Sequence, residues 1–405
     1  MKRRLALLLP FLAVAAACSD QTQSPVAPLQ APEAAAAGKY IVVFKGGSLA
    51  PRRSVVGAIR DYATEAGLQP SHVFGTVLEG FAAELTAGQV SALRGDPRVA
   101  YVEPDAEVRL FTTQANPISW GLDRIDNTDL PLNQAYTYTA TGAGVNAYIL
   151  DSGINLNHLD YVGRANYIPN GSGGDFVGDG HGDASDCHGH GSHVAGTVGG
   201  TYSGVAKGVT IWMGRVVNCS GGGNASMVVA GMDWIARNGL KPGVVNMSLG
   251  YGNVTSVRDA AERLVAAGFT VAVAAGNGNF AGVPLDACTE SPANAPNVLT
   301  TGATDQTDKE ASFSNYGTCV DILAPGVAIY SSDYLVTNQV VTKSGTSMAS
   351  PHVAGVAALY LSANPTATPA QVTAAIKNNA KLNTITLHSK SKRYGTPNRF
   401  LFTNY

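Results

Sequence analysis

The sequence is poor in charged residues, and its positive and negative charges nearly balance. Lys, Arg, Asp and Glu make up 14% of its 405 residues, and the formal net charge is -2. A nucleic-acid-binding surface is normally basic, so this composition favours no nucleic-acid partner. After the N-terminus, the chain also lacks an uninterrupted run of about eighteen apolar residues, which a membrane-spanning helix requires. What remains, 45% hydrophobic residues and 46 glycines, is typical of a compact, turn-rich globular protein.

The N-terminal residues predict an export signal over residues 1–18. Three basic residues at positions 2–4 precede an apolar stretch over residues 5–17 that ends in alanines. The segment Ala15–Cys18 resembles a bacterial lipoprotein signal, in which the cysteine is lipidated, although Ala15 stands where that pattern prefers Leu. Ordinary signal cleavage near Cys18 is the alternative. Residues 19–38, rich in Ala, Pro, Gln and Ser, predict a flexible tether.

Cysteine is scarce, with five residues and no CxxC spacing, which disfavours a cysteine-based metal site. Without Cys18 the set is even, and an exported protein meets an oxidising compartment in which cysteines normally pair. Four cysteines allow three connectivities. Their order along the chain suggests two disulfides, Cys187–Cys219 and Cys288–Cys319.

Residues 39–112 predict a small α+β domain with a βαββαβ succession, as in ferredoxin-like folds. Period-two and helical spacings alternate along it. The predicted elements are a strand over Lys39–Lys45, a helix over Val55–Ala66, strands within His72–Leu85, a helix over Gln89–Arg94 and a strand over Val99–Val102. The Thr-, Gln- and Pro-bearing stretch Phe111–Pro117 then predicts a linker.

Residues 113–405 predict an α/β domain, a mostly parallel sheet with helices on both faces, because buried strands alternate with helical patterns and no repeat is visible. The predicted strands are Val145–Leu150, Thr210–Val217, Val244–Met247, Thr270–Ala274 and Val298–Thr301. The predicted helices are Ser226–Arg237, Val257–Ala267 and Ser347–Leu361.

Three segments place a reactive residue among glycines. Asp151 directly follows a predicted strand, at the sheet edge where open α/β proteins hold their sites, although a turn-capping Asp is the simpler interpretation. His190 lies in HGHGSH, which lacks the i,i+4 pair and intervening Glu of a helical zinc site and suits a general base. Ser347 begins a helical run, where free N–H groups favour negative charge, or where a serine simply caps the helix.

Together the three segments resemble the active-site motifs of the subtilisin-like serine proteases (subtilases), in that family's order of Asp, His and Ser. The resemblance covers nearly all of residues 120–405 and is strongest to the proteinase K branch with its aqualysin-like bacterial members. It implies that Asp151, His190 and Ser347 are acid, base and nucleophile. His188, His193 and His352 are then structural. Residues 39–112 resemble the family's inhibitory propeptide, which implies self-cleavage near Thr112 or Thr113.

The family resemblance also assigns the oxyanion hole and the substrate groove. Val271–Asn277 resembles the oxyanion-hole strand, so Asn277 and the Ser347 N–H are the expected donors. Main-chain pairing of a peptide along two segments implies broad specificity, with an apolar or aromatic side chain preferred before the scissile bond. The residues expected to bind substrate are Gly221, Gly222, Gly223, Ser248, Leu249, Gly250, Ala274 and Gly276.

Structural Ca²⁺ is expected from the same resemblance. One site is Asp321 with the carbonyls of Pro296 and Val298. A second is Asp123, Asp126 and Asn127, although Asn133 stands where relatives often carry Asp. The acidic loop containing Asp175, Asp179, Asp183 and Asp186 is either a third site or a solvated loop.

The resulting hypothesis is a secreted, monomeric serine endopeptidase that acts on proteins and peptides, with its own propeptide as inhibitor. A lipid on Cys18 would tether it to the membrane only before maturation. The alternatives are a catalytically silent subtilase used for binding, a structural surface lipoprotein, and a serine esterase. The esterase is disfavoured because no GxSxG elbow surrounds Ser347.

Overall fold

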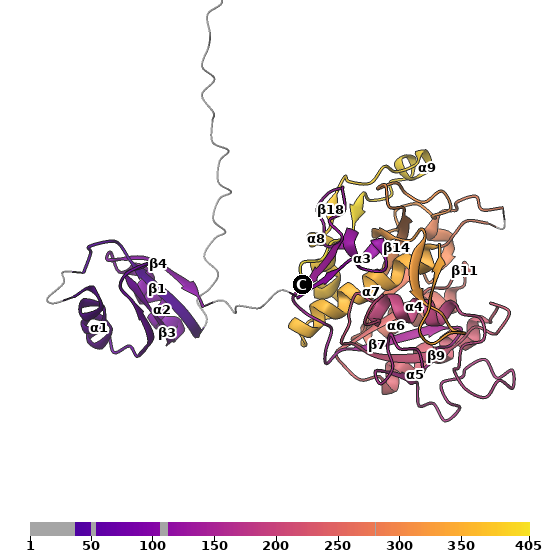
Figure 1. Cartoon of the computed structure of the whole chain (residues 1–405), viewed down its shortest axis with the longest axis horizontal. Coiled ribbons are helices and arrows are strands. Elements are labelled where there is room, and N and C mark those ends of the chain that lie inside the picture. Colours follow the sequence, from indigo (N-terminus) through magenta and orange to yellow (C-terminus); the bar gives the residue numbers. More distant parts are fainter. Residues whose placement is uncertain (1–36, 50–53, 106–111, 280) are drawn as a thin grey trace, which may run out of the picture. The chain divides into compact units, whose positions relative to one another are not determined.

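The computed structural model describes residues 37–49, 54–105, 112–279 and 281–405. The predicted export signal, Cys18 and nearly all of the predicted tether lie outside these residues. The chain divides into two compact units, residues 1–108 and 109–405, and Figure 1 shows the described part of each. No helix of the described residues is long and apolar enough to cross a membrane.

The first unit is a four-stranded antiparallel sheet with two helices, and its strand order is β2-β3-β1-β4. The Ser54 hydroxyl caps α1, and Thr86 with Gln89 forms a capping box on α2. Val42, Ile59 and Phe81 are fully buried between sheet and helices. The elements follow the predicted βαββαβ succession: β1 (Gly38–Phe44), α1 (Val55–Glu65), β2 (Pro70–Phe74), β3 (Gly80–Leu85), α2 (Ala87–Gly95) and β4 (Val99–Pro104).

The second unit is built on a nine-stranded sheet in the order β18-β19-β15-β14-β12-β10-β7-β9-β8, parallel except for the β18–β19 pair. Every residue of β10 and β12 is buried, so both faces of the sheet are covered. This confirms the predicted fold class. The strands are β7 (Asn146–Asp151), β8 (Ala165–Tyr167), β9 (Thr210–Arg215), β10 (Gly243–Met247), β12 (Thr270–Ala274), β14 (Leu299–Thr304), β15 (Ile322–Pro325), β18 (Lys381–Leu382) and β19 (Arg399–Phe400).

Two pairs of packed helices contact this sheet. Helix α4 packs on α7 and α5 packs on α6, and α7 contacts β10, β12 and β14 (Figure 1). The long helices are α4 (His190–Gly199), α5 (Ala225–Asn238), α6 (Thr255–Ala266), α7 (Thr346–Ala363) and α8 (Pro369–Asn379). Shorter elements are β5 (Thr112–Ala115), α3 (Trp120–Ile125), β6 (Ala135–Tyr138), β11 (Tyr251–Gly252), η1 (Ala287–Thr289), β13 (Glu290–Ser291), β16 (Ile329–Ser332), β17 (Val340–Lys343) and α9 (Ser389–Arg393).

Helix α7 is buried on nearly every side, which is why its sequence, TSMASPHVAGVAALYLSA, has no polar face. Small residues let neighbouring chain segments approach it closely. A Cβ added at Gly355 would lie 2.5 Å from Val205 Cβ and 3.1 Å from Val198 O. The glycine is therefore required by the contact between α7 and the segment that follows α4.

We expect Gly355→Ala to lower the thermal unfolding midpoint, because relief of that overlap costs about 1–3 kcal/mol. The variant should be made in a Ser347→Ala chain so that proteolysis does not interfere, and unfolding followed by circular dichroism. Gly252→Ala is the matched control, because a Cβ there meets nothing within 4 Å. Equal midpoints for the two variants would contradict this account of the packing.

Candidate active site

Asp151 is the last residue of β7, a central strand paired with β10 on one side and β9 on the other. Its carboxylate is 1% exposed, and a buried carboxylate needs hydrogen-bond donors. The Oδ1 atom accepts from the Ser152 N–H and from His190 Nδ1, each at 2.7 Å. The sheet therefore places a carboxyl group directly against a histidine ring.

His190 is the first residue of α4, and its neighbours determine where that helix begins. The Asp186 carboxylate accepts from the backbone N–H groups of His188, Gly189 and Ser192 at 2.8–3.0 Å, which satisfies free donors at the helix start. A Cβ at Gly191 would lie 2.2 Å from Gly153 O, so only glycine lets α4 approach the end of β7. The glycines around His190 thus hold its ring against Asp151.

Asp151 also sets the protonation of His190. Burial lowers the pKa of the imidazole, but the negative charge of Asp151 and its hydrogen bond together outweigh burial and leave the pKa above the usual value of 6.5. The bond to Nδ1 leaves Nε2 as the nitrogen that takes up and releases the proton. The ring is 24% exposed, so this nitrogen can meet a substrate.

Ser347 is the second residue of α7. Its Oγ donates to Ser248 O at 3.1 Å, and its own carbonyl accepts from Ser248 Oγ at 2.8 Å. No hydrogen bond joins Ser347 to His190 among the described residues, and catalytic hydrogen bonds often tighten only when substrate is bound. Rotation about χ1, the one side-chain torsion of serine, redirects this hydroxyl toward a different hydrogen-bond acceptor.

Two hydrogen-bond donors converge beside Ser347. Asn277 Oδ1 accepts from the backbone N–H and the hydroxyl of Thr346, at 2.8 and 3.0 Å, which fixes the orientation of the amide. A Cβ built on Gly345 would lie 3.4 Å from Asn277 Nδ2 and 3.6 Å from the Ser347 nitrogen. The missing side chain of Gly345 therefore leaves a space that both donors border, as an oxyanion hole requires.

A buried polar network supports the backbone around Ser347, and no sequence motif predicted it. Asn246 on β10 donates to Ser248 Oγ at 2.9 Å and accepts from Ser350 Oγ at 2.7 Å. Ser152 similarly connects the Gly191 N–H to the Asp186 carboxylate. The signal was a polar residue inside an otherwise apolar strand, since buried polar groups require partners.

A cavity of about 200 Å³ lies beside the catalytic pair, and its wall includes most of the predicted substrate-binding residues. The lining residues are Asp151, His188, His190, Val217, Gly221, Gly223, Ser248, Leu249, Gly250 and Tyr251. Gly221 and Gly222 belong to a turn around Asn218, whose Oδ1 accepts the Gly222 N–H at 3.0 Å. Ala274 and Gly276 do not line this cavity, and Gly276 N donates to Thr346 Oγ1 at the start of α7 instead.

The three histidines expected to be structural, His188, His193 and His352, differ in their surroundings. His193 bonds Ile329 O and His352 bonds Met348 O, and burial lowers their pKa values to about 3 and about 4. Both rings are therefore neutral and structural at neutral pH. His188 instead lines the cavity, with its ring centre 6.3 Å from that of His190.

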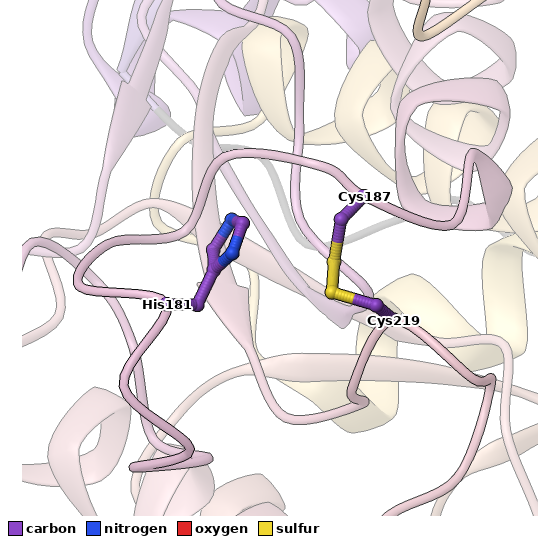
Figure 2. A group of neighbouring side chains, drawn as sticks. All are labelled: His181, Cys187 and Cys219. Carbon is purple, nitrogen blue, oxygen red and sulfur yellow. A yellow bond between two sulfur atoms is a disulfide. The ribbon is translucent and has the colours of Figure 1, made fainter.

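The structure forms both disulfides in the pairing that the chain order suggests, Cys187–Cys219 and Cys288–Cys319. His181 and the sulfurs of the first pair lie within 4.8 Å of one another (Figure 2). Because these two sulfurs are bonded to each other, they are not thiolates and this group is not a metal site. The disulfide instead joins the loop before α4 to the loop that contributes Gly221.

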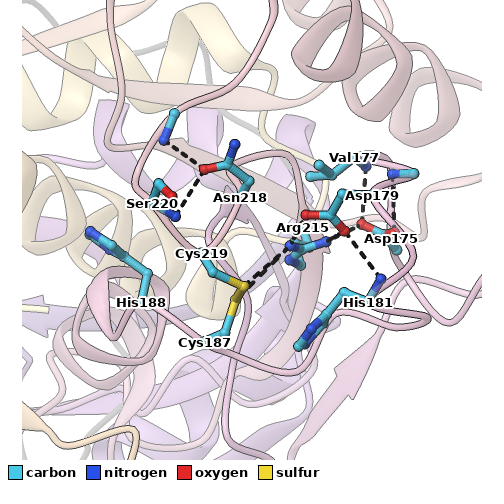
Figure 3. Close-up of polar contacts among 12 residues, drawn as sticks. Asp175, Val177, Asp179, His181, Cys187, His188, Arg215, Asn218, Cys219 and Ser220 are labelled. Atoms are coloured by element: carbon cyan, nitrogen blue, oxygen red, sulfur yellow. Dashed lines mark hydrogen bonds and ion pairs between the residues drawn. A yellow bond between two sulfur atoms is a disulfide. The ribbon is translucent and has the colours of Figure 1, made fainter.

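In the acidic loop predicted as a third calcium site, two of the four aspartates pair with an arginine of the protein itself. The buried Arg215 guanidinium donates to Asp175 Oδ1 at 2.9 Å and to Asp179 Oδ2 at 2.7 Å (Figure 3). Asp183 accepts from the Ser185 N–H, and Asp186 caps α4. No three of these carboxylates gather within 4.8 Å in the described part of the chain.

The residues of the predicted Asp123 site fit a calcium ion. Asn127 Nδ2 donates to Asp123 O at 2.5 Å, Asp123 Oδ1 at 2.8 Å and Asp126 Oδ1 at 3.3 Å. Three oxygens thus face one point, the arrangement that a hard cation uses. Burial, and then the charge of Asp123, raises the pKa of Asp126 to about 6, as expected for clustered carboxylates without a cation. Asn133 contributes its backbone N–H to Asp123 rather than its side chain.

This fold and site are those of a serine hydrolase on a parallel α/β sheet, with a His–Asp pair, a serine at a helix start and two amide donors that border one space. Comparison with known proteins gives the family. Residues 142–400 match the Subtilase family and residues 39–111 match Peptidase inhibitor I9. The chain belongs to the subtilase family, and its N-terminal unit is a propeptide-type inhibitor domain.

The relatives cover the whole chain. The sequence is 46% identical over 428 residues to an extracellular serine proteinase of a Thermus species, and the match covers 100% of both chains. It is 36% identical over 413 residues to proteinase R of Parengyodontium album, covering 99% of each. A crystal structure of a cold-adapted subtilisin-like serine proteinase aligns with TM-score 0.65 and 46% identity over 72% of this chain and 100% of that one.

We expect the acid limb of the kcat/KM profile to have its midpoint above pH 6.5, because activity requires neutral His190 and is lost as pH falls through its raised pKa. In Asp151→Asn the charge that raises the pKa of His190 most is lost while burial still lowers it, so the midpoint should move to lower pH. The rate should also fall by about 10⁴, since the imidazolium loses its stabilising charge.

Hydrolysis of a chromogenic peptide amide measures both effects. Asp259→Asn, a half-exposed carboxylate on α6, is the control and should behave as the parent does. An acid limb that stays in place in Asp151→Asn would rule out the assigned pair.

Proposed function

We propose that Ser347 is the nucleophile, His190 the general base and Asp151 the orienting acid of this serine endopeptidase. Ser347 Oγ attacks the scissile carbonyl while His190 Nε2 takes its proton. Asp151 keeps the Nδ1 proton in place and stabilises the imidazolium. His190 then donates the proton to the leaving amine, and water hydrolyses the acyl-enzyme by the same route. The observation that carries this assignment is the bond of 2.7 Å between Asp151 and His190, in a cavity that is also lined by Ser248, the hydrogen-bond partner of Ser347.

The developing oxyanion accepts hydrogen bonds from Asn277 Nδ2 and the Ser347 N–H, which border one space beside Gly345. Preorganised donors of this kind act in the transition state more than in the ground state. A peptide substrate pairs through its main chain with the Gly221–Gly223 turn and the Ser248–Gly250 segment. Gly250, which lines the cavity beside His190, leaves room for a large apolar or aromatic side chain before the scissile bond.

The inhibitor domain is removed by the enzyme itself near Thr112 or Thr113. Both residues are exposed and belong to β5, whose partner β6 is part of the catalytic unit. A cut at the start of β5 therefore leaves that strand pair intact in the mature enzyme. The boundary agrees with the inhibitor match, which ends at residue 111.

Calcium stabilises the mature enzyme through Asp123, Asp126 and Asn127. Its charge would replace the amide donor that now bonds three oxygens, and the Asn127 side chain would turn its carbonyl oxygen inward. The N-terminal residues export the chain, and Cys18 is the proposed lipid attachment site. Maturation would then release the catalytic unit from the membrane as a monomer.

Mass spectrometry of the purified full chain, beside a Ser347→Ala copy, tests the nucleophile and self-processing together. We expect only the parent to lose residues up to about Thr112, because the substituted chain has no hydroxyl to attack the carbonyl. If both copies stay whole, or both are cut alike, the result favours a catalytically silent binding module over a protease. The mass of the uncut copy also reports a lipid on Cys18.

We expect Asn277→Leu to lower kcat about 10²–10³-fold with a small change in KM, since a transition-state donor is lost. Asn279→Leu, two residues further along the same loop, is the control. Comparison of peptide amides with simple esters separates the protease from an esterase: an esterase would cleave only the esters. A kcat in Asn277→Leu equal to that of the control would remove Asn277 from the mechanism.

A further inference from the structure

Asp321 lies where β14 and β15 run side by side in the sheet. Its backbone N–H donates to Thr300 O at 2.8 Å, and its Oδ2 accepts the Thr300 N–H at 2.9 Å. Thr300 comes two residues after Val298, so the carboxylate is held close to the chain segment whose carbonyls were expected to share a calcium ion with it. One carboxylate oxygen, Oδ1, remains for a cation.

That oxygen already holds a cation that belongs to the chain. Lys377 Nζ donates to Asp321 Oδ1 at 2.5 Å, and the two side chains are 28% and 19% exposed. Lys377 is in the last turn of α8, where the helix dipole also favours positive charge. The positive charge of Lys377 is therefore stabilised both by the Asp321 carboxylate and by the dipole of α8.

The Asp123 cluster differs in this respect. Among the described residues no Lys or Arg donates to Asp123 or Asp126; the donors are backbone N–H groups and the neutral amide of Asn127. Two carboxylates without a positive partner attract a divalent ion. At Asp321, by contrast, one carboxylate and one ammonium already cancel, and a calcium ion would have to displace the ammonium from its oxygen.

We propose that the Lys377 ammonium takes the place of a calcium ion at Asp321 and ties α8 to the β14–β15 edge of the sheet. The family-based expectation of a calcium ion on Asp321, Pro296 and Val298 therefore does not hold for this chain, whereas the Asp123 site keeps its ion. This part of the fold is then insensitive to removal of calcium. The inference does not depend on the proteolytic mechanism.

Removal of the lysine tests the proposal. The measurement is the number of Ca²⁺ ions bound per full-length Ser347→Ala chain, by isothermal titration calorimetry, for that parent, Lys377→Met and Lys392→Met. Lys392 is an exposed lysine on α9 and controls for the loss of one positive charge. We expect Lys377→Met to bind one more ion than the parent, and Lys392→Met to match the parent.

Two further variants show whether the added ion binds at Asp321. Asp321→Asn combined with Lys377→Met should lose the added ion, which assigns it to Asp321. Asp321→Asn alone should bind as many ions as the parent, and this comparison remains available if Lys377→Met does not fold. An unchanged count in folded Lys377→Met, or a lost ion in Asp321→Asn alone, would overturn the proposal.

Discussion

The burial of α7 against the central strands is the constraint on which the rest of the structure depends. This helix has apolar or small residues on every side, so it is stable only when the sheet, α4 and α8 surround it. Its first turn carries Ser347 to the carboxyl ends of β10 and β12. Because the same ends position Asn277 and Ser248, packing of one apolar helix brings the proposed nucleophile together with its proposed oxyanion donors.

Such a site places polar atoms in a region without water, and two local networks satisfy several of them, whereas Asp151 Oδ2 has no hydrogen-bond partner among the described residues. Asn246 connects the hydroxyls of Ser248 and Ser350 behind the nucleophile. The Asp186 carboxylate caps α4 and, through Ser152, holds the helix start beside Asp151. A missing partner in either network would leave a buried group unpaired, which costs about 1–3 kcal/mol. These residues therefore position the groups of the active site, although none of them is expected to touch the substrate.

Several carboxylates outside the site pair with a cation of the chain itself. Arg124 pairs with Asp308, Arg215 with Asp175 and Asp179, and Lys377 with Asp321. Each pair joins segments far apart in the sequence. The Arg or Lys side chain therefore links these segments, as a bound metal ion does in other proteins. Among the described residues, Asp123 and Asp126, which we propose bind calcium, accept hydrogen bonds only from backbone N–H groups and the Asn127 amide.

Much of this protein was determined by its sequence alone. The parallel α/β class and the βαββαβ unit follow from apolar periodicity, whereas the inhibitor role and the candidate triad follow from local motifs that resemble those of the subtilases. The sequence did not predict α8 or β15, and it gave no indication that Lys377 contacts Asp321. Only the tertiary structure brings Lys377 to that carboxylate and Asn246 to Ser350. These are contacts between residues distant in sequence, and their partners are decided by packing, which no local pattern records.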